Sequence, residues 1–164
     1  MTARWRQIAA VIVVVVVAVG AVALVGMAFG GESTPTATRT EYQATVKDVR
    51  DRVDIAMLRI TKSTSIEQLI ERIRQASTAV ESAAADLGDA GVANGFGNET
   101  EDLVRALQTF SVELFNTSEQ FQDPTFEPNL GSLNSLGFQG WETVNDSLAE
   151  LREQGIRVPL LQRH

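Results

Sequence analysis

The sequence lacks cysteine and has only one histidine, which is the last residue, His164. Without cysteine the chain forms no disulfide, offers no thiol nucleophile or sulfur ligand, and has no site for cysteine-linked lipid. A single terminal histidine also excludes a multi-histidine metal site and an internal histidine base for a serine nucleophile. We therefore expect no catalytic residue, no metal and no cofactor, and a protein that is not an enzyme.

Positive charge is scarce after the N-terminus. The chain has 14 basic and 21 acidic residues, a net charge of −7, and Arg4 and Arg6 are the only charged residues before Glu32. Without those two arginines, 12 basic residues remain against 21 acidic ones, so residues 32–164 carry −9. Nucleic acids and anionic lipid surfaces attract dense positive charge. We therefore expect no nucleic-acid partner.

A long uncharged segment precedes this acidic part. Gln7 to Gly31 contains no charge, and the 22 residues from Ile8 to Phe29 are apolar except for two glycines. As a helix they would extend about 33 Å, enough for a hydrocarbon layer of roughly 30 Å. Within lipid, a lone segment satisfies its backbone only as a helix. The sequence predicts a transmembrane signal anchor over residues 8–30 whose partner is membrane lipid.

The few charges near the start of the chain orient this anchor. Positive residues stay on the cytoplasmic side, so residues 1–7 form a short basic cytoplasmic N-terminus and the C-terminal domain lies outside the cytoplasm. The residues assigned to the anchor and its inner interface are Arg4, Trp5, Arg6, Ile8, Val15, Leu24 and Phe29.

A cleaved signal peptide is the alternative interpretation. Its apolar region would be shorter, about 7–15 residues, and small residues would precede the cut. Ala21–Ala23 and Ala28–Gly30 fit such sites, which would release a secreted or periplasmic protein cut near residue 23 or 30. The apolar run continues without a polar break, however, and this favours the uncleaved anchor.

One glycine pair in the anchor weakly indicates self-association. Gly26 and Gly30 have the spacing found where membrane helices pack closely as dimers. The pair lies at the outer end of the segment, where small residues are common in any case. A homo-oligomer is therefore an expectation with little support.

The remaining sequence predicts a polar Thr-rich linker over residues 31–40 and an all-α domain over 41–164. Apolar residues recur at spacings of three and four in four segments, a pattern typical of amphipathic helices. The expected helices are about 40–62, 64–87, 98–121 and 139–154. Their inward stripes are Tyr42, Val46, Val49, Val53, Ala56, Ile60; Ile66, Ile70, Ile73, Val80, Ala84, Leu87; Leu103, Leu107, Phe110, Leu114, Phe121; and Trp141, Val144, Leu148, Leu151.

Several short signals refine these helices. A capping box is available at Thr64 with Glu67 or at Ser65 with Gln68, and Gly88 is a natural helix stop. We predict an antiparallel bundle of about four helices with a long irregular loop before the last one.

That loop, Asp123 to Trp141, combines proline and glycine with large apolar residues. Long loops in compact domains are often functional. The favoured interpretation is a cover over one end of the bundle. The alternative is a partner-binding loop anchored by Trp141, with Phe126, Leu130 and Phe138 beside it.

Two other patterns fall short of known sites. Gly95–Thr100 resembles a dinucleotide fingerprint, but a helix is expected before it and Thr100 replaces the third glycine. Asn98, Asn116 and Asn145 begin glycosylation sequons, which matter only in a host that modifies exported asparagines.

From the sequence we expect a single-pass membrane protein that presents an acidic helical bundle outside the cytoplasm. Its expected role is protein binding or envelope assembly with an envelope protein as partner. A secreted or periplasmic ligand-binding bundle is the alternative. A cell-envelope enzyme without a familiar motif is the third and least favoured hypothesis.

Overall fold

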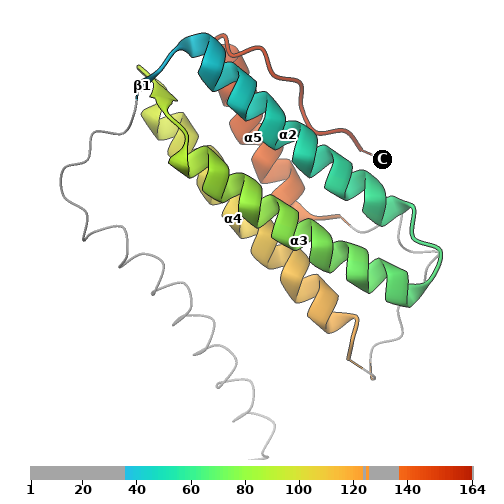
Figure 1. Cartoon of the computed structure of the whole chain (residues 1–164). Helices are drawn as coiled ribbons and strands as arrows, with labels where there is room; N and C mark the ends of the chain where they lie inside the picture. The colour runs from blue at the N-terminus through green and yellow to red at the C-terminus, as the bar shows by residue number, and fades with distance from the viewer. Residues whose placement is uncertain (1–35, 124, 126–136, 164) are drawn as a thin grey trace, which may run out of the picture. The chain divides into compact units, whose positions relative to one another are not determined.

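The computed structural model describes residues 36–123, 125 and 137–163, and its described part is all-helical with four helices (Figure 1). The helices are α2 (Arg39–Thr61), α3 (Ile66–Asp89), α4 (Gly97–Gln120) and α5 (Gln139–Glu153), and the two short strands are β1 (Thr36–Ala37) and β2 (Val92–Ala93). The four predicted helices are confirmed to within a few residues. The predicted transmembrane helix lies outside the described residues. Within the described ranges, no helix has the length and apolarity needed to cross a membrane.

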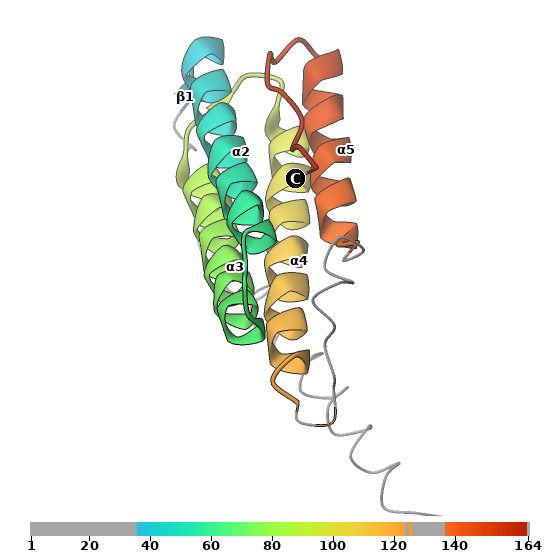
Figure 2. The same cartoon turned by 90° about the vertical axis from the view of Figure 1, so that its right-hand side faces the viewer.

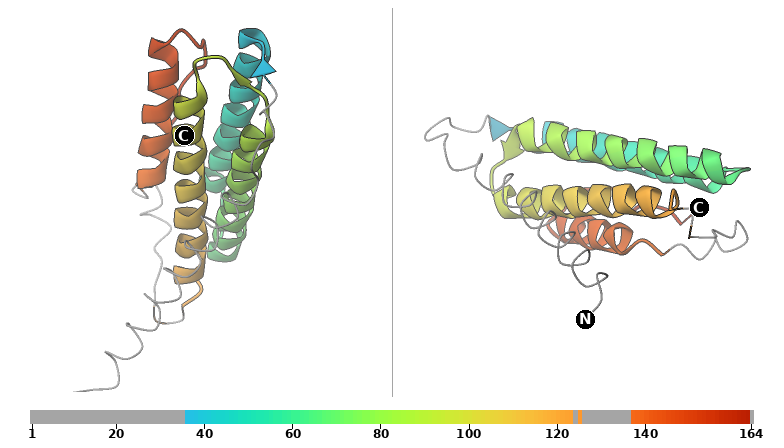
Figure 3. Two further views of the ribbon diagram at one scale, coloured as in Figure 1. Left: turned by 90° about the vertical axis from the view of Figure 1, so that its left-hand side faces the viewer. Right: turned by 90° about the horizontal axis from the view of Figure 1, so that it is seen from below.

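The four helices form an antiparallel bundle. α2 packs against α3, α3 against α4, and α4 against α5. Successive helices run in alternating directions (Figure 2), and α4 lies between α5 and the α2–α3 pair in both views of Figure 3. The bundle expected from the sequence is therefore present, and each helix packs against the next one along the chain.

Local capping explains where α2 and α3 begin. Thr38 and Glu41 form a capping box, in which the Thr38 amide donates to Glu41 Oε2 at 2.9 Å and Thr38 Oγ1 accepts from the Glu41 amide. Ser65 Oγ accepts from the Gln68 amide at 3.2 Å at the start of α3. Each side chain satisfies a backbone donor that the first helical turn leaves free. Of the two predicted capping boxes for α3, the structure forms one half of that at Ser65, and the Gln68 side chain accepts from the Thr64 amide at 2.8 Å.

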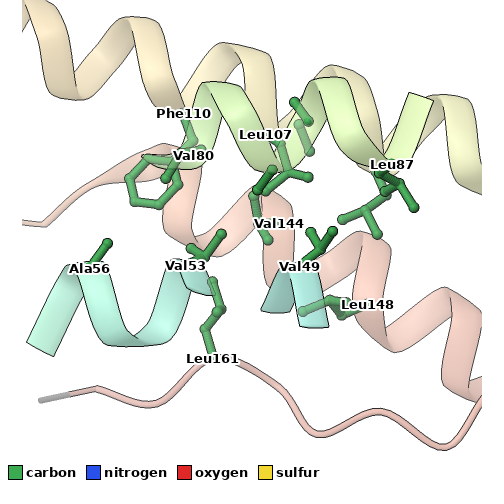
Figure 4. Close-up of a cluster of buried hydrophobic side chains, with 14 of the residues drawn as sticks. Val49, Val53, Ala56, Val80, Leu87, Leu107, Phe110, Val144, Leu148 and Leu161 are labelled. Carbon is green, nitrogen blue, oxygen red and sulfur yellow. The ribbon is translucent and has the colours of Figure 1, made fainter. Parts of the chain in front are cut away.

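The core follows the predicted stripes with one shift in α3. Leu69 is fully buried, whereas Ile66 and Ile70, which the stripe placed inward, are only partly buried. α3 also continues through Gly88 to Asp89 instead of stopping there. Figure 4 shows Val49, Val80, Leu107 and their neighbours pointing together from the different helices. The side chains that the structure buries most completely include Tyr42, Val46, Val53, Leu69, Ile73, Leu87, Leu103, Leu107, Phe110, Leu114, Leu148 and Leu151.

A two-residue parallel pairing fastens the start of the domain. Thr36 pairs with Val92 and Ala37 with Ala93, so β1 lies beside the connection between α3 and α4. These residues belong to the segment assigned to the linker, and Thr38 after them caps α2. Two residues are too few to produce the alternation by which a strand is recognised in sequence. Regular structure in the described residues therefore begins at Thr36, within the segment that the sequence assigned to the linker.

The first backbone amides of α5 are capped by a side chain of α4 and not by a residue at the start of α5 itself. Phe138 precedes α5 and makes no side-chain cap, and Glu113 of α4 accepts instead from the amides of Gln139 at 2.9 Å and Gly140 at 2.7 Å. A carboxylate suits the positive end of a helix. A Cβ on Gly140 would lie 2.7 Å from Phe110 Cα, so only glycine permits this close approach of the two helices.

Candidate functional site: the groove that holds the C-terminal tail

The chain does not leave the bundle after α5. It turns at Gln154–Gly155, and the C-terminal tail (residues 156–163) then runs without regular secondary structure beside α2 (Figures 1 and 2). Ile156, Val158 and Leu161 are buried, at 0%, 2% and 4% exposed. The tail thus inserts three aliphatic side chains into the bundle, and Leu161 points toward Val53 of α2 (Figure 4).

Side chains of α2 form one wall of the groove that holds this tail. Gln43 Oε1 accepts from the Arg157 amide at 3.0 Å, and Asp54 Oδ1 accepts from the Gln162 amide at 2.7 Å. Between them, Arg50 donates to the Leu160 carbonyl through both Nε, at 3.1 Å, and Nη2. These three residues, at spacings of seven and four along α2, follow the length of the tail.

The other wall comes from α5. Asn145 Oδ1 accepts from the Leu161 amide at 2.7 Å, and Asn145 Nδ2 donates to the Leu161 carbonyl at 3.5 Å. We call Gln43, Arg50, Asp54 and Asn145 the tail groove. All of these bonds end on main-chain atoms of the tail, so the groove recognises the tail's backbone and the shape of its aliphatic side chains. Strand-adding peptide sites share this logic, although there a sheet edge supplies the main-chain partners.

Arg50 is the charged centre of the groove. Its side chain is 8% exposed, and Nη1 donates to Asp51 Oδ1 at 2.9 Å. Asp51 also accepts from Lys47 Nζ at 2.6 Å, and the hydrogen bonds from Lys47 and Arg50 lower the pKa of Asp51. A buried guanidinium needs such partners, since an unpaired buried charge is strongly destabilising. Removal of the tail would leave Nε and Nη2 facing outward as a pair of donors suited to a carbonyl or a carboxylate.

A second set of contacts holds the turn between α5 and the tail. Arg39 Nη2 donates to the Gln154 carbonyl at 2.6 Å, and the Arg39 guanidinium lies 5.6 Å from the Phe96 ring centre. Gln154 Nε2 donates to Glu99, a bond that lowers the pKa of Glu99. Gly155 has φ +89°, a left-handed conformation that other residues adopt only with strain. The tail therefore leaves α5 through a single specialised glycine.

The structure places only some of the predicted site residues. The anchor residues Arg4, Trp5, Arg6, Ile8, Val15, Leu24 and Phe29, and Phe126 and Leu130 of the loop, lie outside the described residues. Phe138 is buried and its ring centre is 6.0 Å from that of Phe110, so it belongs to the core. Trp141 is half-buried, and the Arg163 guanidinium of the tail lies 5.2 Å from its ring centre.

The sequence interpretation missed the tail groove entirely. Arg50 and Asp54 lie outside the inward stripe that the sequence predicts for α2, and the sequence marks Asn145 only as a sequon. One short signal was available: Ile156 and Val158 flank Arg157 directly after a helix stop, although Leu160 and Leu161 then break the alternation. A period near two after a helix indicates an extended segment with one buried side.

The structure also bears on the sequons and the glycine-rich loop. Asn145 is buried and bonded to the tail, whereas Asn98 and Asn116 are exposed on α4. In the loop, β2 follows α3, and Phe96 packs on Tyr42 at 5.5 Å between ring centres. The Thr100 hydroxyl bonds Tyr42 Oη at 2.7 Å and the Phe96 carbonyl at 2.6 Å. Phe96 and Thr100, two of the residues in the fingerprint-like segment, therefore serve internal packing.

Comparison with protein-family models, curated proteins and solved structures finds no match to this chain. Within the described ranges, no three or more histidine, cysteine or carboxylate side chains gather closely enough to hold a metal ion. The tail groove and the sequence that precedes the bundle are therefore the features from which a function is inferred.

Proposed function

We propose that this protein is a single-pass membrane protein with a cytoplasmic N-terminus, whose acidic helical bundle works outside the cytoplasm in protein binding or envelope assembly. One observation carries the topology: an uncharged stretch, Gln7 to Gly31, lies between the only two basic residues of the N-terminus and a part of the chain with net charge −9. An apolar segment of this length inserts as a helix, and the positive flank stays inside.

The tail groove supports the binding role. It holds an extended segment through main-chain hydrogen bonds from Gln43, Arg50, Asp54 and Asn145, together with three buried aliphatic side chains. A groove built in this way discriminates by shape and backbone geometry, which suits a peptide ligand. The net charge of −9 over residues 32–164 favours basic partners over nucleic acid or anionic lipid.

The intact mass of the native full-length chain tests whether the N-terminal segment is retained. The intact mass of the protein purified from membranes should correspond to a chain that retains its N-terminal segment. A mature chain that starts near Leu24 or Gly31 would overturn the anchor and favour the secreted or periplasmic alternative.

Because the chain contains no cysteine, single-cysteine variants provide an independent test. Ser82, exposed on α3, and Thr2 are suitable positions. A membrane-impermeant maleimide should label the Ser82→Cys variant in intact cells and the Thr2→Cys variant only after the membrane is opened. Labelling of Thr2→Cys alone in intact cells would reverse the orientation.

A further inference from the structure

We propose that Asn94 is a site of spontaneous covalent modification, at which attack by the Gly95 backbone nitrogen converts the side-chain amide to aspartate and isoaspartate. The pair lies in the turn between β2 and α4, and β2 pairs with β1, where the chain enters the bundle. The modification concerns the bundle alone, so it is independent of the membrane topology and of the binding role proposed above.

The reaction requires an asparagine whose side chain can meet the backbone nitrogen of the next residue. That nitrogen loses its proton and attacks Cγ, so a new C–N bond forms. The Cγ–Nδ2 bond breaks, and the leaving NH2 group takes up a proton to depart as ammonia. Water then opens the five-membered succinimide at either carbonyl, which yields aspartate or isoaspartate. The net change replaces NH2 by OH, a gain of about 1 Da, and water is the only co-reactant.

The residue after Asn94 offers little hindrance to this attack. Asn94 is the only asparagine in the sequence that is followed by glycine. A side chain on the following residue would crowd the approach of its nitrogen to Cγ, and glycine has none. Gly95 has φ +88°, and a Cβ placed on it would meet nothing within 4 Å. The residue that supplies the attacking nitrogen is therefore unhindered.

The turn also leaves both reacting groups without competing partners. The Phe96 amide donates to the Ala93 carbonyl at 3.1 Å, and this bond closes the turn across the pair. In the described part of the chain, neither the Asn94 side chain nor the Gly95 amide makes a hydrogen bond, and both residues are exposed. Closure of the succinimide ring requires rotation of the peptide unit between them. That unit contributes neither atom of the bond that closes the turn, so its rotation does not require this bond to break.

The other asparagines in the described residues lack these conditions. Asn98 and Asn116 are exposed, but they lie within α4 and are followed by residues with side chains. A helical backbone fixes the peptide unit after each residue, so its rotation would break the helix. Asn145 is buried, and both polar atoms of its side chain bond the tail. The chain thus contains its own comparison for the reactivity of Asn94.

Formation of isoaspartate at this position would place one additional carbon in the main chain of the turn. Ala93, on one side, is buried and pairs with Ala37 of β1. Phe96, on the other side, packs on Tyr42 of α2. A longer turn misaligns the Phe96 amide and the Ala93 carbonyl, so their bond should weaken. We expect hydrogen exchange at the Phe96 amide to accelerate by about 2- to 12-fold, which corresponds to one backbone hydrogen bond.

Ageing of the purified full-length chain tests the proposal directly. The folded protein is held in neutral buffer, its peptides are weighed at intervals, and fragmentation assigns each change to a residue. Asn94 should gain about 1 Da and yield separate aspartate and isoaspartate forms, at least about 10-fold faster than Asn98 or Asn116. Modification of Asn94 at no more than the rate of these two would overturn the proposal.

Two glycine variants form a matched pair. Gly95→Ala places a methyl group beside the attacking nitrogen and should slow the conversion of Asn94 by about 10-fold or more. Gly97→Ala should leave the rate unchanged, since Gly97 is also exposed and an added Cβ meets nothing within 4 Å. Equal rates in the two variants would contradict the proposed attack.

A second variant avoids the strain that alanine meets at φ +88°. Asn94→Gln keeps an amide and both neighbouring residues, but attack on its longer side chain would form a six-membered ring, and the site should stay unmodified. Conversion of Asn94→Gln as fast as that of the natural chain would count against the succinimide route.

Asn94→Asp separates the two consequences of the reaction. It carries the added negative charge without the additional backbone carbon. Hydrogen exchange at Phe96 should therefore accelerate in the aged isoaspartate form and stay near the original rate in Asn94→Asp. Equal acceleration in both, or none in the isoaspartate form, would overturn the inferred effect of the longer backbone.

Discussion

The bundle joins α3 to α4 and α2 to α5 in different ways. α3 and α4 pack directly, and the Ser77 hydroxyl donates to the Ser111 carbonyl at 2.8 Å across their interface. α2 and α5 are bridged by the C-terminal tail, whose backbone bonds to Arg50 on one side and Asn145 on the other. A helix supplies its own backbone partners, whereas the tail depends on side chains for each such bond. The contact between α2 and α5, which the tail bridges, should therefore open more readily than the direct contact between α3 and α4.

The residue types on the two sides explain the difference. The inward face of α3 contains Ala76, Ala83 and Ala84, which allow a neighbouring helix to approach closely. The groove side contains Arg50 and Asn145, which are buried polar side chains that need partners. A helix face, whose backbone groups are already bonded internally, would leave them unsatisfied. An irregular segment with free amides and carbonyls satisfies them.

The largest expected effect is on the directly packed side. Leu107→Ala removes a fully buried side chain of α4, and it should lower the free energy of unfolding by about 2–5 kcal/mol because a cavity remains. Urea unfolding measures this loss. Val112→Ala, on the same helix but 51% exposed, is the matched control and should change stability by no more than about 0.5 kcal/mol. Equal effects at both positions would contradict the assigned core.

Gly140→Ala tests the close contact that places α5. The added Cβ would lie 2.6–2.7 Å from atoms of Phe110, including backbone, so α5 must shift at a cost of about 1–3 kcal/mol. Thermal unfolding reports this cost. Gly88→Ala, also within a helix but facing open space, should be neutral or slightly stabilising. A neutral Gly140→Ala would show that α4 and α5 are further apart than described.

Arg50→Met should loosen the tail selectively. The methionine keeps part of the aliphatic stem but removes both donors to the Leu160 carbonyl, at a cost of about 1–2 kcal/mol because a released carbonyl can reach water. Hydrogen exchange should accelerate at the amides of Arg157, Leu161 and Gln162 and stay unchanged in the middle of α3 and α4.

The neighbouring arginine provides the control for this variant. Arg52 pairs with Asp48 at 3.0 Å and Asp86 at 2.6 Å near the surface, and Arg52→Met should cost less than about 1 kcal/mol. Uniform acceleration of exchange in Arg50→Met would mean that the tail and the helices open as one unit, and the contrast between the two sides would then fail.

The smallest expected effect is acid loosening of the groove. The pKa of Asp51 is lowered in the folded chain by its hydrogen bonds to Lys47 and Arg50, so its ionised form stabilises the fold at all pH values above the ordinary 3.8. That contribution is lost as pH falls from 3.8 through the lower folded value. Asp51 is 34% exposed, so the loss is at most about 1 kcal/mol. Asp51→Asn should flatten this part of the stability–pH curve, and an identical curve would remove Asp51 from the network.

Much of the fold was determined locally and could be read from the sequence. Stripes such as Tyr42 to Ile60 and Leu103 to Leu114 repeat at the helical period, and α2 and α4 bury the faces that these two stripes define. The cap at Ser65 and the turn at Gly155 depend on residues a few positions apart. Helix formation and capping depend on near neighbours in the chain, so sequence spacing predicts them. The membrane anchor and the partner-binding role remain predictions.

The tail groove was decided only by the tertiary structure. Arg50 and Leu160 are 110 positions apart, Asn145 bonds a segment beyond its own helix, and Gly140 is required only because Phe110 of another helix lies beside it. In sequence, Arg50 and Asp54 resemble solvent-exposed charges, since helical spacing alone does not reveal what covers an outer face. Which polar residues became buried depended on where the C-terminal tail came to rest, and a long-range contact of this kind leaves no periodic signal at either end.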